Sequence, residues 1–120
     1  MAALTLALLA CDLVTAPAGA SRITPPADYR TWWEASRPCI AKPEHRPFSV
    51  IEWYVTDGPL YGADGVPAAA VTVAQRIYLT APFQSVPWVI QHELVHAVNE
   101  IHGPPPDPFT RCRLTWETHE

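Results

Sequence analysis

Two histidines and a glutamate lie close together in the pentad His92-Glu93-Leu94-Val95-His96. On an α-helix, residues four apart lie about 40° apart around the axis and about 6 Å apart along it. Both imidazoles would therefore extend from one face, where they could bind one zinc ion, and the adjacent carboxylate could reach a water. This is the minimum set for metal-assisted hydrolysis: protein ligands, an open coordination position and a base.

The pentad lies in a segment whose apolar side chains recur every three or four residues, the pattern of a half-buried helix. These side chains are Trp88, Val89, Ile90, Leu94, Val95, Val98 and Ile101. We expect the helix to begin near Ser85, a good N-cap, with Pro87 in its first turn. Gly103 and the three prolines after it form a strong stop signal.

A third histidine, His102, follows the first by ten residues. In an unbroken helix its side chain would point well away from His92 and His96. If all three are to bind one metal ion, the chain must therefore turn after about Asn99. Such a turn usually needs a residue with positive φ, and asparagine is among the few residues besides glycine that tolerate it.

The pattern His92-Glu93-x-x-His96-x-x-Asn99-x-x-His102 resembles the metzincin form of the zincin metallopeptidase motif. The resemblance covers eleven residues. It implies that the three histidines bind Zn²⁺ and that Glu93 is the general base of a peptidase. Asn99 stands where the family has glycine, and the only methionine is Met1, so the methionine turn that follows the site in metzincins is absent. The chain therefore resembles a minimal bacterial zincin more than a full metzincin.

Other ligand assignments stay open. Asp107 is a hard oxygen donor just beyond the proline run, and Glu117 is far enough along the chain to act like the glutamate ligand of a gluzincin. Both are rivals of His102 as the third ligand. His45 and His119 lie in loop-like or terminal sequence, where we expect solvated surface residues.

Residues 1–20 resemble an export signal. The apolar run at 2–10 is too short to span a bilayer and is typical of a secretory signal, although no Lys or Arg precedes it. Ala18-Gly19-Ala20 fits a cleavage site, whereas Leu8-Leu9-Ala10-Cys11 resembles a lipobox that would attach a lipid, and so the membrane, at Cys11. We expect a mature domain at 21–120 that is secreted or held in the cell envelope, either periplasmic or lipid-anchored.

Cys39 and Cys112 remain after the signal region as an even pair, which predicts a disulfide in an oxidising compartment. The rival interpretation makes them zinc ligands, although neither belongs to a C-x-x-C pair. The net charge is −4 and no basic patch is present, which argues against nucleic-acid binding.

The remaining sequence predicts an α+β fold, in which a small mixed β-sheet packs on the motif helix beside a short N-terminal helix. The expected elements are a linker through Pro26, a helix at Asp28–Ser36, strands at Phe48–Thr56 and Val71–Thr80, a hairpin tip at Tyr61–Pro67, and a final strand or tail at 110–118. By resemblance to zincins, the Arg76–Thr80 strand is expected to be the sheet edge that holds an extended substrate.

These observations predict an exported, monomeric, zinc-dependent hydrolase. A metallopeptidase acting on a peptide or protein substrate fits best, with Glu93 as general base for a zinc-activated water. Two alternatives stay open: a non-catalytic, zinc-stabilised binding module, and a zinc hydrolase of a non-peptide amide. An open groove along a sheet edge would favour peptides, a closed pocket would favour a small substrate, and neither would favour the module.

Overall fold

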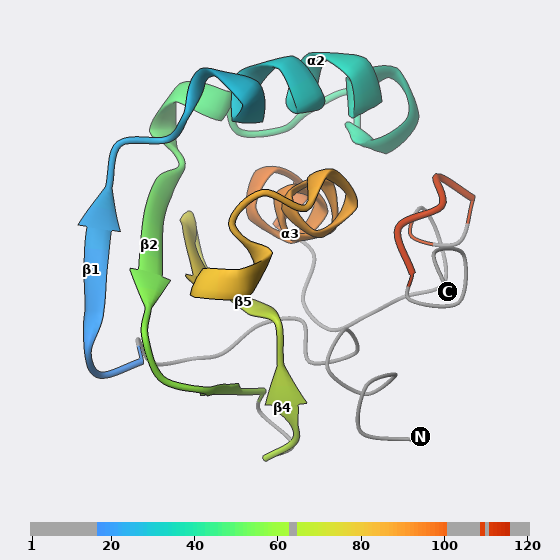
Figure 1. Ribbon diagram of the computed structural model, residues 1–120. Helices are drawn as coiled ribbons and strands as arrows, with labels where there is room; N and C mark the ends of the chain where they lie inside the picture. Colours follow the sequence, from blue (N-terminus) through green and yellow to red (C-terminus); the bar gives the residue numbers. More distant parts are fainter. Residues whose placement is uncertain (1–16, 63–64, 101–108, 110, 116–120) are drawn as a thin grey trace.

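The computed structural model describes residues 17–62, 65–100, 109 and 111–115. Within them the chain forms an α+β fold, which confirms the predicted fold class (Figure 1). The elements in chain order are β1 (Ala20–Ile23), α2 (Ala27–Ile40), a 3-10 turn at Phe48–Val50, β2 (Glu52–Thr56), β3 (Leu60–Tyr61), β4 (Pro67–Ala68), β5 (Ala70–Val73), β6 (Arg76–Thr80), a 3-10 turn at Ala81–Phe83, and α3 (Pro87–Asn99). The motif helix is α3.

Four of these strands form a mixed sheet in the order β1-β2-β6-β5. The β1-β2 and β5-β6 pairs are antiparallel and the β2-β6 pair is parallel. The predicted single strand at Val71–Thr80 is wrong, because Ala74 adopts a φ of 55° and turns the chain into a hairpin. As a result β6 lies inside the sheet, so Arg76–Thr80 is not the edge that we expected to hold substrate. The edge on that side is β5.

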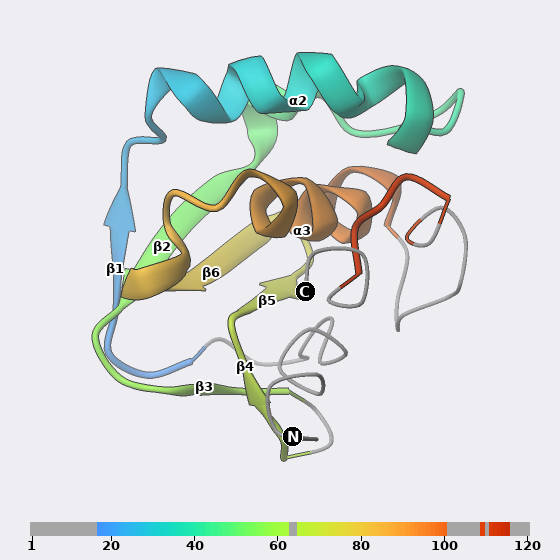
Figure 2. The same cartoon turned by 45° about the vertical axis from the view of Figure 1, so that its right-hand side comes forward.

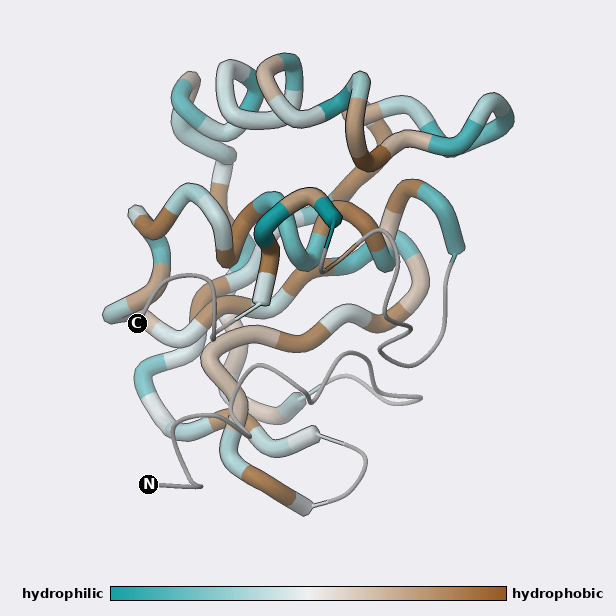
Figure 3. Tube along the Cα trace, turned by 90° about the vertical axis from the view of Figure 1, so that its right-hand side faces the viewer, coloured by the Kyte–Doolittle hydropathy of each residue, from teal (hydrophilic) through white to brown (hydrophobic). Residues whose placement is uncertain are grey.

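Helix α3 lies between α2 and the sheet (Figures 1 and 2). Ten of its thirteen residues are buried, including the whole run from His92 to Asn99. The expectation of a half-buried helix is therefore wrong, because α2 covers the face that a surface helix would expose. Figure 3 shows hydrophobic residues concentrated along α3 and the strands, whereas α2 is more hydrophilic. The motif side chains are consequently placed in the interior.

The bounds of both helices differ from those predicted from the sequence. Helix α3 has Pro87 at its first position as expected, but Val86 precedes it as N-cap and Ser85 makes no capping hydrogen bond. Helix α2 begins after Pro26 and continues through Pro38 to Ile40, four residues beyond the predicted end. Proline usually ends a helix. Here the last turn is fixed from outside, since Ile40 is buried and its neighbour Cys39 is cross-linked.

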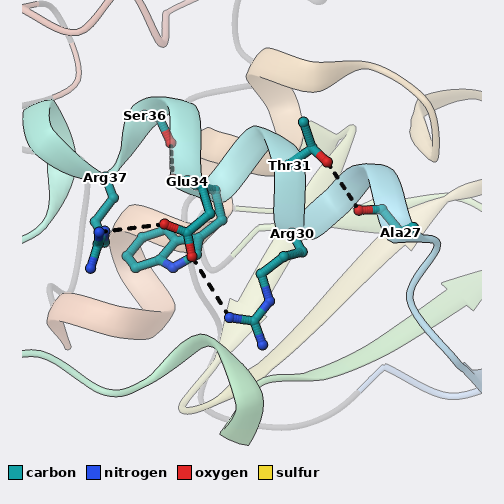
Figure 4. Close-up of polar contacts among 7 residues, drawn as sticks. Ala27, Arg30, Thr31, Glu34, Ser36 and Arg37 are labelled. Carbon is teal, nitrogen blue, oxygen red and sulfur yellow. Dashed lines mark hydrogen bonds and ion pairs between the residues drawn. The ribbon is translucent and has the colours of Figure 1, made fainter.

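The outer face of α2 is polar and the inner face is aromatic. Glu34 forms ion pairs with Arg30 at 3.8 Å and Arg37 at 3.4 Å on the exposed side (Figure 4). On the inner side Trp33 is buried against the 3-10 turn that contains Phe48, with ring centroids 6.3 Å apart. Trp33 is therefore part of the hydrophobic core. These ion pairs lie within α2 and are exposed, so they contribute little, and the aromatic face supplies the packing of α2 on the domain.

A disulfide joins Cys39 at the end of α2 to Cys112, as predicted. The two cysteines are 73 residues apart in sequence. In the chain-entropy model a bridge across such a loop stabilises the folded state by about 4 kcal/mol. The C-terminal turn is thereby tied to the helical layer beside α3.

The N-terminal expectations are met only in part by the described residues. Residues 20–23 form β1 and pair with β2, so the predicted linker through Pro26 is wrong. Cys11 and most of the predicted signal lie outside the described residues, so export and lipid attachment stay predictions. Among the described residues, no helix has the length and apolar character needed to cross a membrane.

Candidate metal centre

His92, Glu93 and His96 all lie within α3 and all are buried, with exposed fractions of 3%, 2% and 2%. Residues four apart share one face of a helix, and here the two imidazole ring centroids are 5.3 Å apart. The sequence spacing thus places two imidazoles side by side in the interior, with a carboxylate on the residue after the first.

His92 is oriented by a backbone group from the C-terminal turn. Its Nδ1 lies 2.6 Å from the carbonyl oxygen of Leu114. A carbonyl only accepts, so Nδ1 carries the proton and donates it, and Nε2 is the bare nitrogen. This Nε2 is buried and has no hydrogen-bond partner among the described residues. A buried polar atom without a hydrogen-bond partner lowers the stability of the folded state by about 1–3 kcal/mol, unless a ligand binds to it.

Burial also keeps the His92 ring neutral. Desolvation, followed by the neighbouring charge of His96, lowers the pKa of His92 to about 3, although the bond to Leu114 opposes this shift. At neutral pH the imidazole is therefore uncharged, which is the form that binds metals. A neutral imidazole with a fixed Nδ1 proton and a bare Nε2 is suited to zinc.

Phe109 covers the histidine pair. Its ring centroid lies 4.5 Å from that of His92 and 4.8 Å from that of His96, and its side chain is 2% exposed. For 110–118 we expected a final strand or an extended tail, and the strand is wrong for the described part, since residues 111–113 form turns. Sequence reasoning missed both Phe109 and the Leu114 carbonyl, because neither is part of a periodic pattern and a backbone acceptor has no residue signature.

Glu93 is hydrogen-bonded to the edge strand of the sheet. The hydroxyl of Thr72 on β5 lies 2.6 Å from Oε1 of Glu93 and 3.5 Å from its backbone oxygen. Thr72 is itself buried. A hydrogen bond of this length is at the short end of the range for O–H donors, so Thr72 fixes the direction of the Glu93 carboxyl group. The sequence offered no signal for this contact, because the two residues belong to different elements.

Asn99 does not supply the left-handed turn that we expected. It is the last helical residue, and Glu100 takes the left-handed conformation, with φ 57° and ψ 39°. The Asn99 side chain instead bonds to the end of α2. Its Nδ2 donates to the Ile40 carbonyl at 2.8 Å, and its Oδ1 accepts from the Lys42 N–H at 3.0 Å. It therefore caps α2 from the neighbouring helix.

Because Asn99 caps α2 and Glu100 makes the left-handed turn, substitutions at these two adjacent positions should have opposite effects on stability. Asn99→Ala should lower the free energy of unfolding by about 2 kcal/mol, because the buried Ile40 carbonyl and the partly buried Lys42 N–H lose their partner. Glu100→Gly should be neutral or stabilising by up to about 1 kcal/mol, because glycine adopts the left-handed conformation without strain. Urea unfolding of both variants measures the difference. A destabilised Glu100→Gly beside a neutral Asn99→Ala would contradict it.

The third ligand cannot be placed in this site. His102 and its rivals Asp107 and Glu117 lie outside the described residues, as does His119. Within the described ranges, no three histidine, cysteine or carboxylate side chains gather as a metal site requires. Cys39 and Cys112, the other proposed ligands, are joined to each other. The described part of the chain therefore supplies two imidazoles and a carboxylate.

A cavity of about 700 Å³ lies at the C-terminal ends of the two helices. Its lining residues are Lys42, Pro43, Glu44, His45, Arg46, Asn99 and Glu100. His45 is not the solvated residue we expected, since it is partly buried and its ring meets the edge of Trp33 at 5.6 Å. The lining includes none of the three motif side chains, so this cavity is not the open groove along a sheet edge that would favour a peptide substrate.

A scan against protein-family models and searches among curated proteins and solved structures found no match to this chain. The resemblance to zincins therefore rests on the motif residues themselves.

Proposed function

We propose that this protein is a zinc-dependent hydrolase that cleaves peptide bonds. His92 and His96 are two of the zinc ligands, His102 is the third, and Glu93 is the general base. The observation that carries the proposal is the buried Nε2 of His92, which lacks a hydrogen-bond partner among the described residues and lies beside the His96 ring. Such an atom favours a ligand, and zinc is the metal that imidazole pairs of this spacing bind.

Bound there, zinc would polarise a carbonyl and make a water acidic enough to attack it. The other work is done by residues of this chain. Glu93 accepts the water's proton and passes it to the leaving amine. Thr72 holds the carboxylate through its 2.6 Å hydrogen bond, and Leu114 holds the His92 ring. Burial strengthens both interactions.

The disulfide supports the proposed location. Structural disulfides persist in oxidising compartments, so a secreted or envelope protein is favoured. A peptide substrate follows from the resemblance to zincins alone, since all four residues of the edge strand β5 are buried.

A structural zinc site in a non-catalytic module is the second candidate, and burial favours it. The three motif side chains are at most 3% exposed, and Phe109 lies against both imidazoles. In that case zinc would cross-link α3 and the C-terminal segment without performing chemistry.

Metal analysis of the purified protein, followed by a broad peptide-cleavage screen, tests the proposal. We expect one zinc per chain, and cleavage that a chelator abolishes and added zinc restores. A protein that contains no zinc and binds none would overturn both candidates. Zinc without cleavage of any peptide would favour the structural site.

The contact between Thr72 and Glu93 gives a separate prediction for the hydrolase. Thr72→Val keeps the shape and removes the hydroxyl, so kcat should fall by about 10- to 100-fold, the usual cost of losing an orienting partner. Thr72→Ser keeps the hydroxyl and should retain most activity. Zinc content should not change in either variant, and kcat with metal analysis measures both.

Thr56→Val is the matched control. Thr56 is equally buried, but its hydroxyl bonds to Gly58 and it is not in contact with the motif. Its kcat should equal that of the wild type. If Thr56→Val and Thr72→Val lose activity equally, the Thr72 hydroxyl acts through stability alone.

A further inference from the structure

The C-terminal turn, residues 109 and 111–115, contacts the histidine pair at two points. Phe109 packs against both rings, and the Leu114 carbonyl accepts the Nδ1 proton of His92. A backbone hydrogen bond also joins these two residues, in which the Leu114 N–H donates to the Phe109 carbonyl at 2.8 Å. The turn is therefore one unit, and a shift of any part would move the acceptor of His92.

This turn is tied to α2 through the disulfide. Cys112 is bonded to Cys39, and the Arg111 guanidinium donates to the Cys39 carbonyl at 3.3 Å. At the other end Leu114 is buried in the core. The bridge and the buried leucine thus hold the turn from opposite sides, two residues apart.

Arg113, between these two anchors, has a φ of 62°. A left-handed conformation costs a residue other than glycine about 1–2 kcal/mol, and it persists only where the surroundings impose it. Here Arg113 lies between the disulfide at Cys112 and the buried Leu114, two anchors that limit how the backbone can relax. Without the bridge, relaxation of Arg113 would turn the Leu114 carbonyl away from His92.

We infer that the Cys39–Cys112 disulfide is a positioning device for the metal centre and makes its zinc affinity dependent on redox state. The inference rests on the proposed zinc site. The bridge holds the Leu114 carbonyl, the carbonyl fixes the His92 ring, and the fixed ring presents Nε2 to the metal. Losing an orienting partner of this kind typically weakens metal binding by 10- to 100-fold.

Reduction of the bridge is chemically accessible. Both cysteine side chains are only partly buried, so a dithiol reductant can reach them. Two electrons and two protons pass from the dithiol to the S–S bond, which breaks into two thiols, while the dithiol closes to its own cyclic disulfide. Reduction leaves the three motif side chains chemically unchanged, but it frees two thiols that can themselves bind zinc. The test therefore removes the bridge by replacing both cysteines with alanine.

The test compares zinc affinity of the oxidised wild type with that of a Cys39→Ala/Cys112→Ala double variant, by competition with a chromogenic chelator. We expect the dissociation constant to rise 10- to 100-fold. Leu79→Ala is the control for lost stability, since it removes a buried side chain from β6 and leaves the turn intact. Its zinc affinity should stay within about threefold of wild type, because β6 does not touch His92 Nδ1.

Two further measurements keep the inference testable if the double variant does not fold. Leu114→Gly keeps the bridge but frees the carbonyl, and it should weaken zinc binding to a similar extent. Imidazole ¹⁵N spectra of the metal-free wild type should show one His92 tautomer, protonated at Nδ1, and this preference should be lost in Leu114→Gly.

The possible results distinguish the role of the disulfide from the proposed zinc site. A folded double variant, or a Leu114→Gly variant, that binds zinc as tightly as the wild type overturns this inference and leaves the proposed function standing. A wild-type protein that binds no zinc overturns the metal site itself.

Discussion

Glu93→Gln should retain one zinc per chain while kcat for peptide cleavage falls by about 100- to 10,000-fold, the range that general acid–base catalysis contributes. The amide has the shape of the carboxylate, and its oxygen can still accept the Thr72 hydroxyl that lies 2.6 Å from Glu93 Oε1. It cannot take a proton from water. Zinc content and steady-state kinetics on the same sample measure the two effects.

The matched control is Glu100→Gln. Glu100 follows α3 and makes an ion pair with Arg46 at 3.4 Å, with its own side chain 59% exposed. The same chemical change there should leave kcat unaltered. Melting temperatures of the two variants test whether unfolding explains the loss of kcat. We expect that it does not, because replacing a buried carboxylate with a neutral amide should not destabilise the domain. A Glu93→Gln enzyme that cleaves at the wild-type rate would remove Glu93 from the mechanism.

The sequence predicted α3 well and its environment poorly. Pro87 and the apolar spacing located the helix, because both act within a few residues. Its burial on all sides depends on α2, which is more than forty residues earlier in the chain. The hairpin between β5 and β6 was missed for a related reason. Ala74 carries no turn signal, and only strand pairing forces its positive φ.

The candidate metal centre, like the fold, has one part that could be predicted from the sequence and one that could not. The shared helix face of His92 and His96 follows from spacing alone, so it could be predicted. The groups that orient them could not, since Leu114 contributes a backbone oxygen and Thr72 belongs to a different element. Asn99 was assigned a local role from its conformational tolerance. Its amide instead satisfies two backbone groups at the end of α2, and tertiary hydrogen bonding outweighed local preference.

The identity of the third ligand is the most consequential remaining prediction. Two imidazoles from one helix hold zinc weakly, whereas protein zinc sites use three or four ligands. His102→Ala should therefore weaken zinc binding by orders of magnitude, so that metal is lost at micromolar free zinc. Asp107→Ala and Glu117→Ala should retain it. Chelator competition on the three variants, with His119→Ala as a matched histidine control, gives the comparison.

The left-handed residue that turns the chain after α3 is Glu100 and not Asn99. The break in the helix therefore falls two residues before His102. Asn99, which stands where the metzincin pattern has glycine, does not make the turn, so this substitution does not affect it. If His102 binds zinc, Glu100→Gly should keep full affinity because glycine preserves that turn. Glu100→Pro should lose affinity, because proline fixes φ near −65° and cannot adopt the left-handed conformation. Equal zinc affinity in Glu100→Gly and Glu100→Pro would show that the turn at residue 100 does not position a zinc ligand. Retention of zinc by His102→Ala, with loss in Asp107→Ala or Glu117→Ala, would assign the third ligand to a rival and leave the hydrolase proposal to be judged on Glu93.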